Sequence, residues 1–182
     1  MNDFRIYLRA IEPDDYLVSY KWRNDHELMK GITGMPRFIS QETERKWVMK
    51  AIEENETGCA LRLAICTKED HKLIGYISLL EIDNHNKTCS VSSLIGDKNY
   101  HGSGIIGEAR LLLFRYAFFE LGMNRISAKV LVDNVASIKA CEKFGYVREG
   151  ILRQAVFRNG KYRDVVIYSM LKSEFLSRYP LE

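Results

Sequence analysis

Seven residues at positions 101–107 read His-Gly-Ser-Gly-Ile-Ile-Gly and have the composition of a phosphate-binding loop. Glycines adopt positive φ and let a ligand approach the backbone without a clash with Cβ. The sequence predicts a strand before the loop, at 91–96, and an amphipathic helix after it, at 108–119. The first N–H groups of a helix lack intrahelical partners and lie at the positive end of its dipole. The pattern therefore predicts a phosphate-bearing ligand held by main chain; a glycine-rich connection without a ligand is the alternative.

The elements around this loop alternate in a way that is typical of an α+β fold. Short links between 59–67, 72–82 and 88–96 favour antiparallel pairing. The strand–helix–strand unit that follows requires one parallel pair with a right-handed crossover, and Asn159-Gly160 predicts a final hairpin. We expect a single domain over 1–182 with a mostly antiparallel sheet flanked by helices. The expected strands are 4–10, 59–67, 72–82, 88–96, 125–132, 146–157 and 162–172, and the expected helices are 13–22, 40–54, 108–119 and 136–144.

Composition limits the class of protein. A length of 182 residues fits one domain with a sizeable core. The net charge of +3 is too small to indicate nucleic acid as a partner but is compatible with an anionic cofactor. The four cysteines have neither disulfide nor metal-ligand spacing, so we expect reduced thiols, a cytoplasmic location and no metal. No apolar run reaches membrane-spanning length and no signal-peptide pattern is present, so we expect no membrane partner.

The glycines at 102, 104 and 107 also spell G-x-G-x-x-G, the dinucleotide-binding fingerprint. Asp133 then lies near the end of the next strand, roughly where an acidic ligand of the ribose is required. That fingerprint normally opens a series of parallel βα units. Here the loop follows an antiparallel meander and only one crossover is expected, which argues against a Rossmann fold.

The same residues resemble a different family more closely. Positions 95–104 with Glu108-Ala109 resemble motif A of the GCN5-related N-acetyltransferases (GNAT). Positions 133–137 and 142–146 resemble motif B, and 160–164 resemble a C-terminal pattern of the branch that contains ribosomal-protein and spermidine acetyltransferases. The motifs occur in the family's order over nearly the whole chain. The resemblance implies a GNAT fold, in which the central sheet is splayed.

The resemblance implies acetyl-CoA as cosubstrate, with its pyrophosphate on the glycine loop. The pantetheine arm would pair like an extra strand with the end of the 88–96 strand, which splays from 125–132. Asn134 would hydrogen-bond that arm, and Ser137 would cap its helix or approach the thioester sulfur. The expected cofactor-binding residues are Leu94, Ile95, Gly96, His101, Gly102, Ser103, Gly104, Ile105, Ile106, Gly107, Asn134 and Ser137.

Several positions depart from the family pattern. His101 stands where the family has Gln or Arg, Ile106 stands where a small residue is usual, and Ser103 replaces a commonly basic residue. These changes imply weaker cofactor binding or a slightly displaced loop. Cys141 stands where many relatives carry the tyrosine that protonates the departing thiolate; the alternative reading of this cysteine is a buried hydrophobe.

Amine acetylation requires a proton acceptor and a donor to the thioester oxygen. We expect a free N–H near Leu94 or Ile95 to be the donor. Glu81, acting directly or through a water, is the favoured base, because its strand neighbours the cofactor strand. The predicted catalytic set is thus Glu81, Ser137 and Cys141. Alternative bases, each of which can equally be a solvated surface charge, are Asp25, His26, Glu27, Asp83 and His85.

The acceptor is left open by the sequence. Arg23 can meet a phosphate and Asp25 or Glu27 an amine, since the segment 22–25 resembles one in acetyltransferases of amino-sugar nucleotides. The favoured acceptor is a small-molecule primary amine, of amino-sugar-nucleotide or polyamine type. The alternatives are a protein N-terminus, as in the ribosomal-protein branch, and a coenzyme A-binding module without catalysis. A homodimer is compatible with the sequence, which does not fix the oligomeric state.

Overall fold

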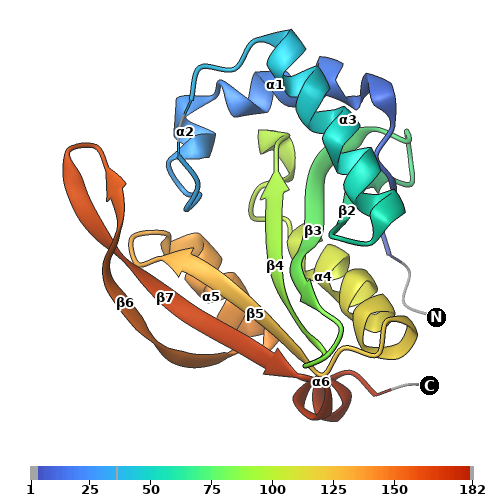
Figure 1. Cartoon of the computed structure of the whole chain (residues 1–182), viewed down its shortest axis with the longest axis vertical. Coiled ribbons are helices and arrows are strands. Elements are labelled where there is room, and N and C mark those ends of the chain that lie inside the picture. The colour runs from blue at the N-terminus through green and yellow to red at the C-terminus, as the bar shows by residue number, and fades with distance from the viewer. Residues whose placement is uncertain (1–3, 36, 181–182) are drawn as a thin grey trace.

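A seven-stranded mixed sheet is the centre of the computed structural model, which describes residues 4–35 and 37–180 (Figure 1). The strands run in the order β1-β2-β3-β4-β5-β7-β6 across the sheet. Every neighbouring pair is antiparallel except β4 and β5, which are parallel. The α+β class with one crossover is confirmed, and the doubly wound sheet of a Rossmann fold is excluded. The strands are β1 (Ile6–Ala10), β2 (Leu61–Thr67), β3 (Leu73–Asp83), β4 (Thr88–Ile95), β5 (Arg125–Leu131), β6 (Val147–Arg158) and β7 (Lys161–Leu171).

Two helices were not predicted from the sequence, and one begins earlier than predicted. A single turn, α2, and the C-terminal α6 are too short to show helical periodicity. The helix after the glycine loop begins at Ile105, so the last three loop residues lie in its first turn. It passes into a π-helical turn instead of ending as regular helix. The helices are η1 (Pro13–Asp15), α1 (Tyr16–Arg23), α2 (His26–Met29), α3 (Gln41–Thr57), η2 (Lys98–Tyr100), α4 (Ile105–Arg115), η3 (Tyr116–Glu120), α5 (Val135–Phe144) and α6 (Lys172–Arg178).

The parallel pair opens after three residues. Thr88–Ser90 of β4 pair with Arg125–Ser127 of β5, and beyond them the two strands separate (Figure 1). β4 stays bonded to β3 as far as Ile95, while β5 stays bonded to β7 along its whole length. Each strand therefore keeps one neighbour and leaves its other edge without a strand partner at the open end of the splay.

The core lies on both faces of the sheet. On one face, aromatic side chains of α4, η3, α5 and α6 pack together with ring centroids 5.1–6.2 Å apart: Phe114, Phe118, Phe144 and Phe175. On the other face, α1 and α3 bury Trp22 and Val48 against Tyr76 of β3. A Cβ at Gly96 would collide with the indole ring of Trp22, so this glycine lets α1 pack on the end of β4. No helix in the described part of the chain is long and apolar enough to cross a membrane.

Candidate functional site

Beyond Ser90, the backbone N–H and C=O groups of every second residue of β4 face the gap between β4 and β5, which we call the splay. The Gly96 N–H donates to the Ile74 carbonyl at 2.8 Å, and a Cβ at Gly75 would collide with the Leu94 carbonyl, so both groups face β3. The Ile95 carbonyl faces the opposite way and accepts from His101 Nε2 at 2.9 Å. Because backbone groups alternate along an antiparallel strand, Ser93 shares the orientation of Ile95. The groups that can pair with a ligand in the splay are therefore those of Ser93 and Ile95 rather than those of Leu94 and Gly96.

The glycine loop is open where a ligand would approach it. Gly102 and Gly104 have φ values of 71° and 87°, which side chains rarely adopt. A Cβ at Gly102 or Gly107 would meet no atom within 4 Å. Gly104 is the N-cap of α4, so the unpaired N–H groups at the start of this helix follow directly. This arrangement suits a phosphate oxygen, as the sequence predicts.

The rest of the loop is fixed from both sides. The His101 ring is bonded to Ile95, and Arg5 donates to the Ser103 carbonyl at 2.9 Å and to Glu108 Oε1 at 2.7 Å. Ile105 is buried in the core, so it can offer a ligand its backbone but not its side chain. Arg5 was not predicted from sequence, because nothing in the pattern places the N-terminal strand against a loop 98 residues away.

A segment that we call the α2 segment (residues 24–35 and 37–39) joins the elements that follow the open end of the splay. Asp25 forms an ion pair with Lys98, after β4, at 2.5 Å. The Gly31 carbonyl accepts from Asn134 Nδ2, after β5, at 2.7 Å. The Ile32 carbonyl accepts from Arg158, at the end of β6, at 2.7 Å. Figure 1 shows α2 beyond the ends of β4 and β5, toward the tip of the β6–β7 hairpin.

Asn134 combines two structural contacts. Its Oδ1 accepts from the Ser137 N–H at 3.0 Å, so Asn134 is the N-cap of α5, and its Nδ2 binds Gly31. One amide hydrogen and one oxygen lone pair remain for a cofactor. Ser137 is the third helical residue rather than the cap, and its hydroxyl makes no hydrogen bond among the described residues.

The structure separates Glu81 from the free edge. This exposed residue lies at a bulge of β3, where the pairing with β4 shifts between Leu80 and Asp83. Gly75, which pairs with Ile95, is six residues away, or about 20 Å along a strand. Glu81 therefore lies at the closed end of the splay.

Cys141 lies inside the core. Its exposed fraction is 0%, and burial raises the pKa of its thiol, an effect that the nearby Arg110 partly opposes. The thiol is therefore protonated at neutral pH and shielded from solvent. This environment is that of a packed apolar side chain.

A pocket of about 340 Å³ lies between the α2 segment and the end of β6. It is lined by Arg23, Asn24, His26, Met29, Lys30, Arg37, Phe38, Arg158 and Asn159. Of the three predicted acceptor-binding residues, Arg23 lines this pocket. Asp25 and Glu27 do not, and they are paired with Lys98 and Lys30. The hydrogen bond from Lys98 is the largest cause of the lowered pKa of Asp25.

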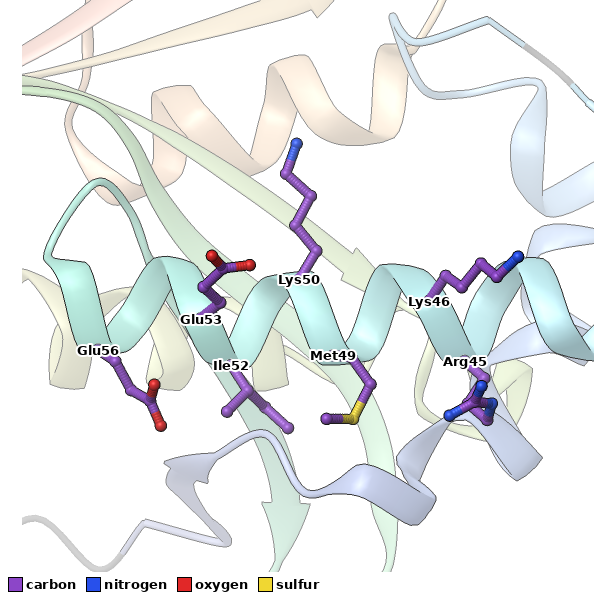
Figure 2. Close-up of a pocket in the computed structure, with 7 residues that line it drawn as sticks. All are labelled: Arg45, Lys46, Met49, Lys50, Ile52, Glu53 and Glu56. Carbon is purple, nitrogen blue, oxygen red and sulfur yellow. The ribbon is translucent and has the colours of Figure 1, made fainter.

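A second hollow, of about 570 Å³, lies along α3 (Figure 2). It is lined by Arg45, Lys46, Met49, Lys50, Ile52, Glu53 and Glu56. Figure 2 shows these side chains spread along one helix, with Glu56 and Lys50 pointing to opposite sides. Neither the glycine loop nor the free edge of β4 contributes to it, so we treat it as a charged helix surface. Among residues 4–35 and 37–180, no cluster of three or more His, Cys, Asp and Glu side chains can hold a metal ion.

Known proteins resemble this chain in sequence and in fold. Residues 5–147 match the family described as "Acetyltransferase (GNAT) domain". The ribosomal-protein-serine acetyltransferase of Escherichia coli is 34% identical over 137 residues, which are 75% of each chain.

Two solved structures superpose on nearly the whole chain. The spermidine N-acetyltransferase of Vibrio cholerae, in complex with CoA and spermine, has a TM-score of 0.85 at 26% identity and covers 94% of this chain and 98% of its own. The microcin C7 self-immunity acetyltransferase MccE, in complex with acetyl-CoA and AMP, has a TM-score of 0.81 at 26% identity and covers 93% of each chain. Since the family match spans well over half of the sequence, the chain belongs to the GNAT family of acetyl-CoA-dependent N-acetyltransferases.

Proposed function

We propose that this protein transfers the acetyl group of acetyl-CoA to a primary amine of a small molecule, by direct attack of the amine on the thioester. The observation that carries the proposal is the free edge of β4, which ends beside the glycine loop. The loop offers backbone N–H groups to the phosphates, and the Ser93–Ile95 edge offers a ladder to the pantetheine arm. The remaining hydrogen of Asn134 can bind the same arm.

The N–H groups of Ser93 and Ile95 face the splay, and we assign one of them to the thioester oxygen. Negative charge develops on this oxygen as the new N–C bond forms, and a fixed backbone donor stabilises it without reorganisation. The C–S bond then breaks, coenzyme A leaves as the thiolate, and the attacking nitrogen releases its extra proton to this thiolate or to solvent. Free cysteine has a pKa of about 8.5, so a similar thiolate can leave without a strong protein acid. The unbonded hydroxyl of Ser137 is our candidate for a contact with the sulfur.

The amine must reach the thioester uncharged, so its ammonium proton needs an acceptor. Among the described residues that line the pocket, His26 is the side chain that can take a proton, since the other polar groups there are guanidinium, ammonium and amide. We therefore propose His26 as the general base in place of Glu81, which lies at the closed end of the splay. Both residues were candidates from the sequence, and the position of Glu81 in the sheet register supports His26.

The acceptor class rests on the relatives and on the pocket. Spermine in one structural relative and AMP in another support small molecules of the polyamine or the nucleotide type. The second candidate is a protein N-terminus, which the similarity to a ribosomal-protein acetyltransferase supports. A non-catalytic coenzyme A-binding module has no support from the family assignment. A cytoplasmic location stays a prediction.

Thiol release from acetyl-CoA tests the proposal. The panel consists of spermidine, amino sugars with and without phosphate, and a peptide with a free N-terminal serine, and mass spectrometry identifies the product. We expect thiol release with a small amine and a product whose mass equals that of the amine with one added acetyl group. Acetylation of the peptide alone would favour the second candidate, and cofactor binding without thiol release would contradict catalysis.

We also propose a homodimer formed through β6. This edge strand exposes the apolar side chains of Val147, Ile151, Leu152 and Phe157. Two register shifts interrupt the strand, so we expect side-chain packing rather than an added strand at the contact. Light scattering after gel filtration tests this: a dimeric mass that becomes monomeric in Ile151→Glu supports it, and a monomeric native protein contradicts it.

A further inference from the structure

Arg158 is a buried cation without a counter-charge. Its exposed fraction is 7%. One terminal nitrogen donates to the carbonyls of Ile32 and Gly34, while the Nε–H is buried and has no partner. No carboxylate of the described residues forms an ion pair with it.

Such a group is costly in the protein alone. A buried charge requires pairing as well as hydrogen bonds, and the loss of one partner of a buried pair is strongly destabilising. Backbone carbonyls satisfy part of the guanidinium but do not neutralise it. The two bonds to carbonyls are explained if Arg158 holds the α2 segment in place. This role does not explain why the guanidinium has no negatively charged partner.

The pocket beside Arg158 has an excess of positive charge. Arg23, Lys30 and Arg37 line it together with Arg158, and none of the described residues that line it carries a carboxylate. Arg23 forms an ion pair with Glu44 at 3.5 Å, and Lys30 forms one with Glu27 at 2.5 Å. The exposed Arg37, like Arg158, has no ion-pair partner within the described chain. The guanidinium groups of Arg37 and Arg158, which have no carboxylate partner among the described residues, therefore line the same pocket.

This pocket adjoins the place where acetyl transfer would occur. Asn134, which follows β5 and is assigned to the pantetheine arm, binds Gly31 of the α2 segment. Arg158 binds the residue next to it, Ile32. The pocket therefore lies next to the open end of the splay.

A second buried guanidinium has a different environment. Arg110 is also buried and has unpaired nitrogens, but its guanidinium lies 5.5 Å from the centre of the Tyr146 ring and beside Cys141. It lines neither of the two hollows described above. A cation over an aromatic face is itself favourable, so Arg110 does not indicate a ligand.

We propose that the acceptor amine carries a doubly charged anionic group, such as a phosphate monoester, bound by Arg158 and Arg37. This inference rests on the proposed function and narrows its substrate class. A planar guanidinium forms paired, charge-assisted hydrogen bonds with phosphate, and two of them balance its charge. Polyamines, which are cations, are disfavoured by the same pocket, and the nucleotide type of acceptor is the one that fits.

The test compares a matched pair of amines, glucosamine and glucosamine 6-phosphate, with spermidine as the cationic acceptor. The variants are Arg158→Met and Arg37→Met, with Arg45→Met on the outer side of α3 as the matched control. We expect kcat/KM to be about tenfold higher for the phosphorylated sugar, the scale of one charged hydrogen bond. Each pocket variant should remove most of this preference and the control should keep it. Arg37→Met keeps the test valid if Arg158→Met loosens the α2 segment, because Arg37 is exposed.

Binding without turnover separates this inference from the proposed function. Inorganic phosphate is titrated calorimetrically into protein saturated with coenzyme A, so that the glycine loop is already occupied. If the native protein binds phosphate, both pocket variants lose this binding and no amine gives thiol release, the anion site is supported and the proposed acetyl transfer is wrong. Turnover with equal kcat/KM for the two sugars, or with spermidine preferred, would overturn the anion site alone. If Arg158→Met instead weakens coenzyme A but not dephospho-coenzyme A, the cation serves the cofactor's own phosphate and the proposal is wrong.

Discussion

Replacement of Asn134 separates two contacts made by one side chain. In the native protein its Oδ1 caps α5 and its Nδ2 holds the Gly31 carbonyl. Asn134→Ala removes both contacts. Asn134→Ser keeps an oxygen that can cap the helix but is too short to reach Gly31. The two variants therefore differ by the cap alone.

The expected magnitudes follow from these contacts. Loss of an N-cap costs about 1 kcal/mol, and loss of one neutral hydrogen bond costs about 1 kcal/mol. Asn134→Ala should thus lower the free energy of unfolding by about 2 kcal/mol and Asn134→Ser by about 1 kcal/mol. For a chain of this size 1 kcal/mol corresponds to a Tm change of roughly 2–4 °C. Thermal melts followed by circular dichroism measure both values, and equal Tm values for the two variants would refute the capping role.

The same variants test the assignment of Asn134 to the cofactor. Both lose the amide that we assign to the pantetheine arm, so each should raise KM for acetyl-CoA about fivefold, the equivalent of about 1 kcal/mol. The KM for the amine should change less. An unchanged affinity for acetyl-CoA in both variants would mean that Asn134 serves only to cap α5 and to join it to the α2 segment.

Three further predictions concern single side chains. Cys141→Ala should cost about 1 kcal/mol of stability and leave kcat near normal; a loss of kcat of about a hundredfold in a stable protein would instead make this thiol the acid. His26→Gln should lower kcat by about a hundredfold while Glu81→Gln leaves it unchanged, and the reverse pattern would restore the base predicted from sequence. Arg125 lowers the pKa of Glu149 to about 2, with help from a serine hydroxyl. This stabilisation is fully present above the ordinary pKa of 4.5 and is lost as the pH falls through about 2. Glu149→Gln should therefore cost about 1 kcal/mol at pH 7, after allowance for solvent screening, and only a small fraction of that at pH 2. A denaturant series at both pH values checks it.

The fold was largely predictable because its elements carry local signals. Alternating or continuous apolar residues marked the strands, Asn159-Gly160 marked the last hairpin, and the glycine loop marked the start of the crossover helix to within three residues. The one-turn α2 gives no periodic signal, since its residues are ordered by the Asp25 cap and by contacts with distant elements. Those contacts form only after the sheet is assembled.

The site was less predictable for the same reason. Glu81 is on the strand next to β4, as expected, but the antiparallel register places it at the closed end. The backbone groups of Leu94 and Gly96 face β3, so those of Ser93 are at the free edge instead. The sequence does not show this, because the direction of a backbone group depends on the register with which β4 pairs to β3. Arg158 is the last residue of a strand, and only the folded chain shows that its guanidinium is buried against the α2 segment.

The central claim is that the glycine loop holds acetyl-CoA beside the free edge of β4, and calorimetric titration with acetyl-CoA tests it most directly. Gly107→Val is the sharpest probe, because Gly107 has no positive φ and its Cβ would enter open space at the start of α4. Gly150→Val is the matched control, since this glycine on β6 is equally open and equally unstrained. We predict a Kd raised by about tenfold or more in Gly107→Val and unchanged in Gly150→Val, as expected when a side chain displaces a phosphate from charge-assisted hydrogen bonds worth at least 1.4 kcal/mol. An unchanged Kd in a folded Gly107→Val protein would contradict the account.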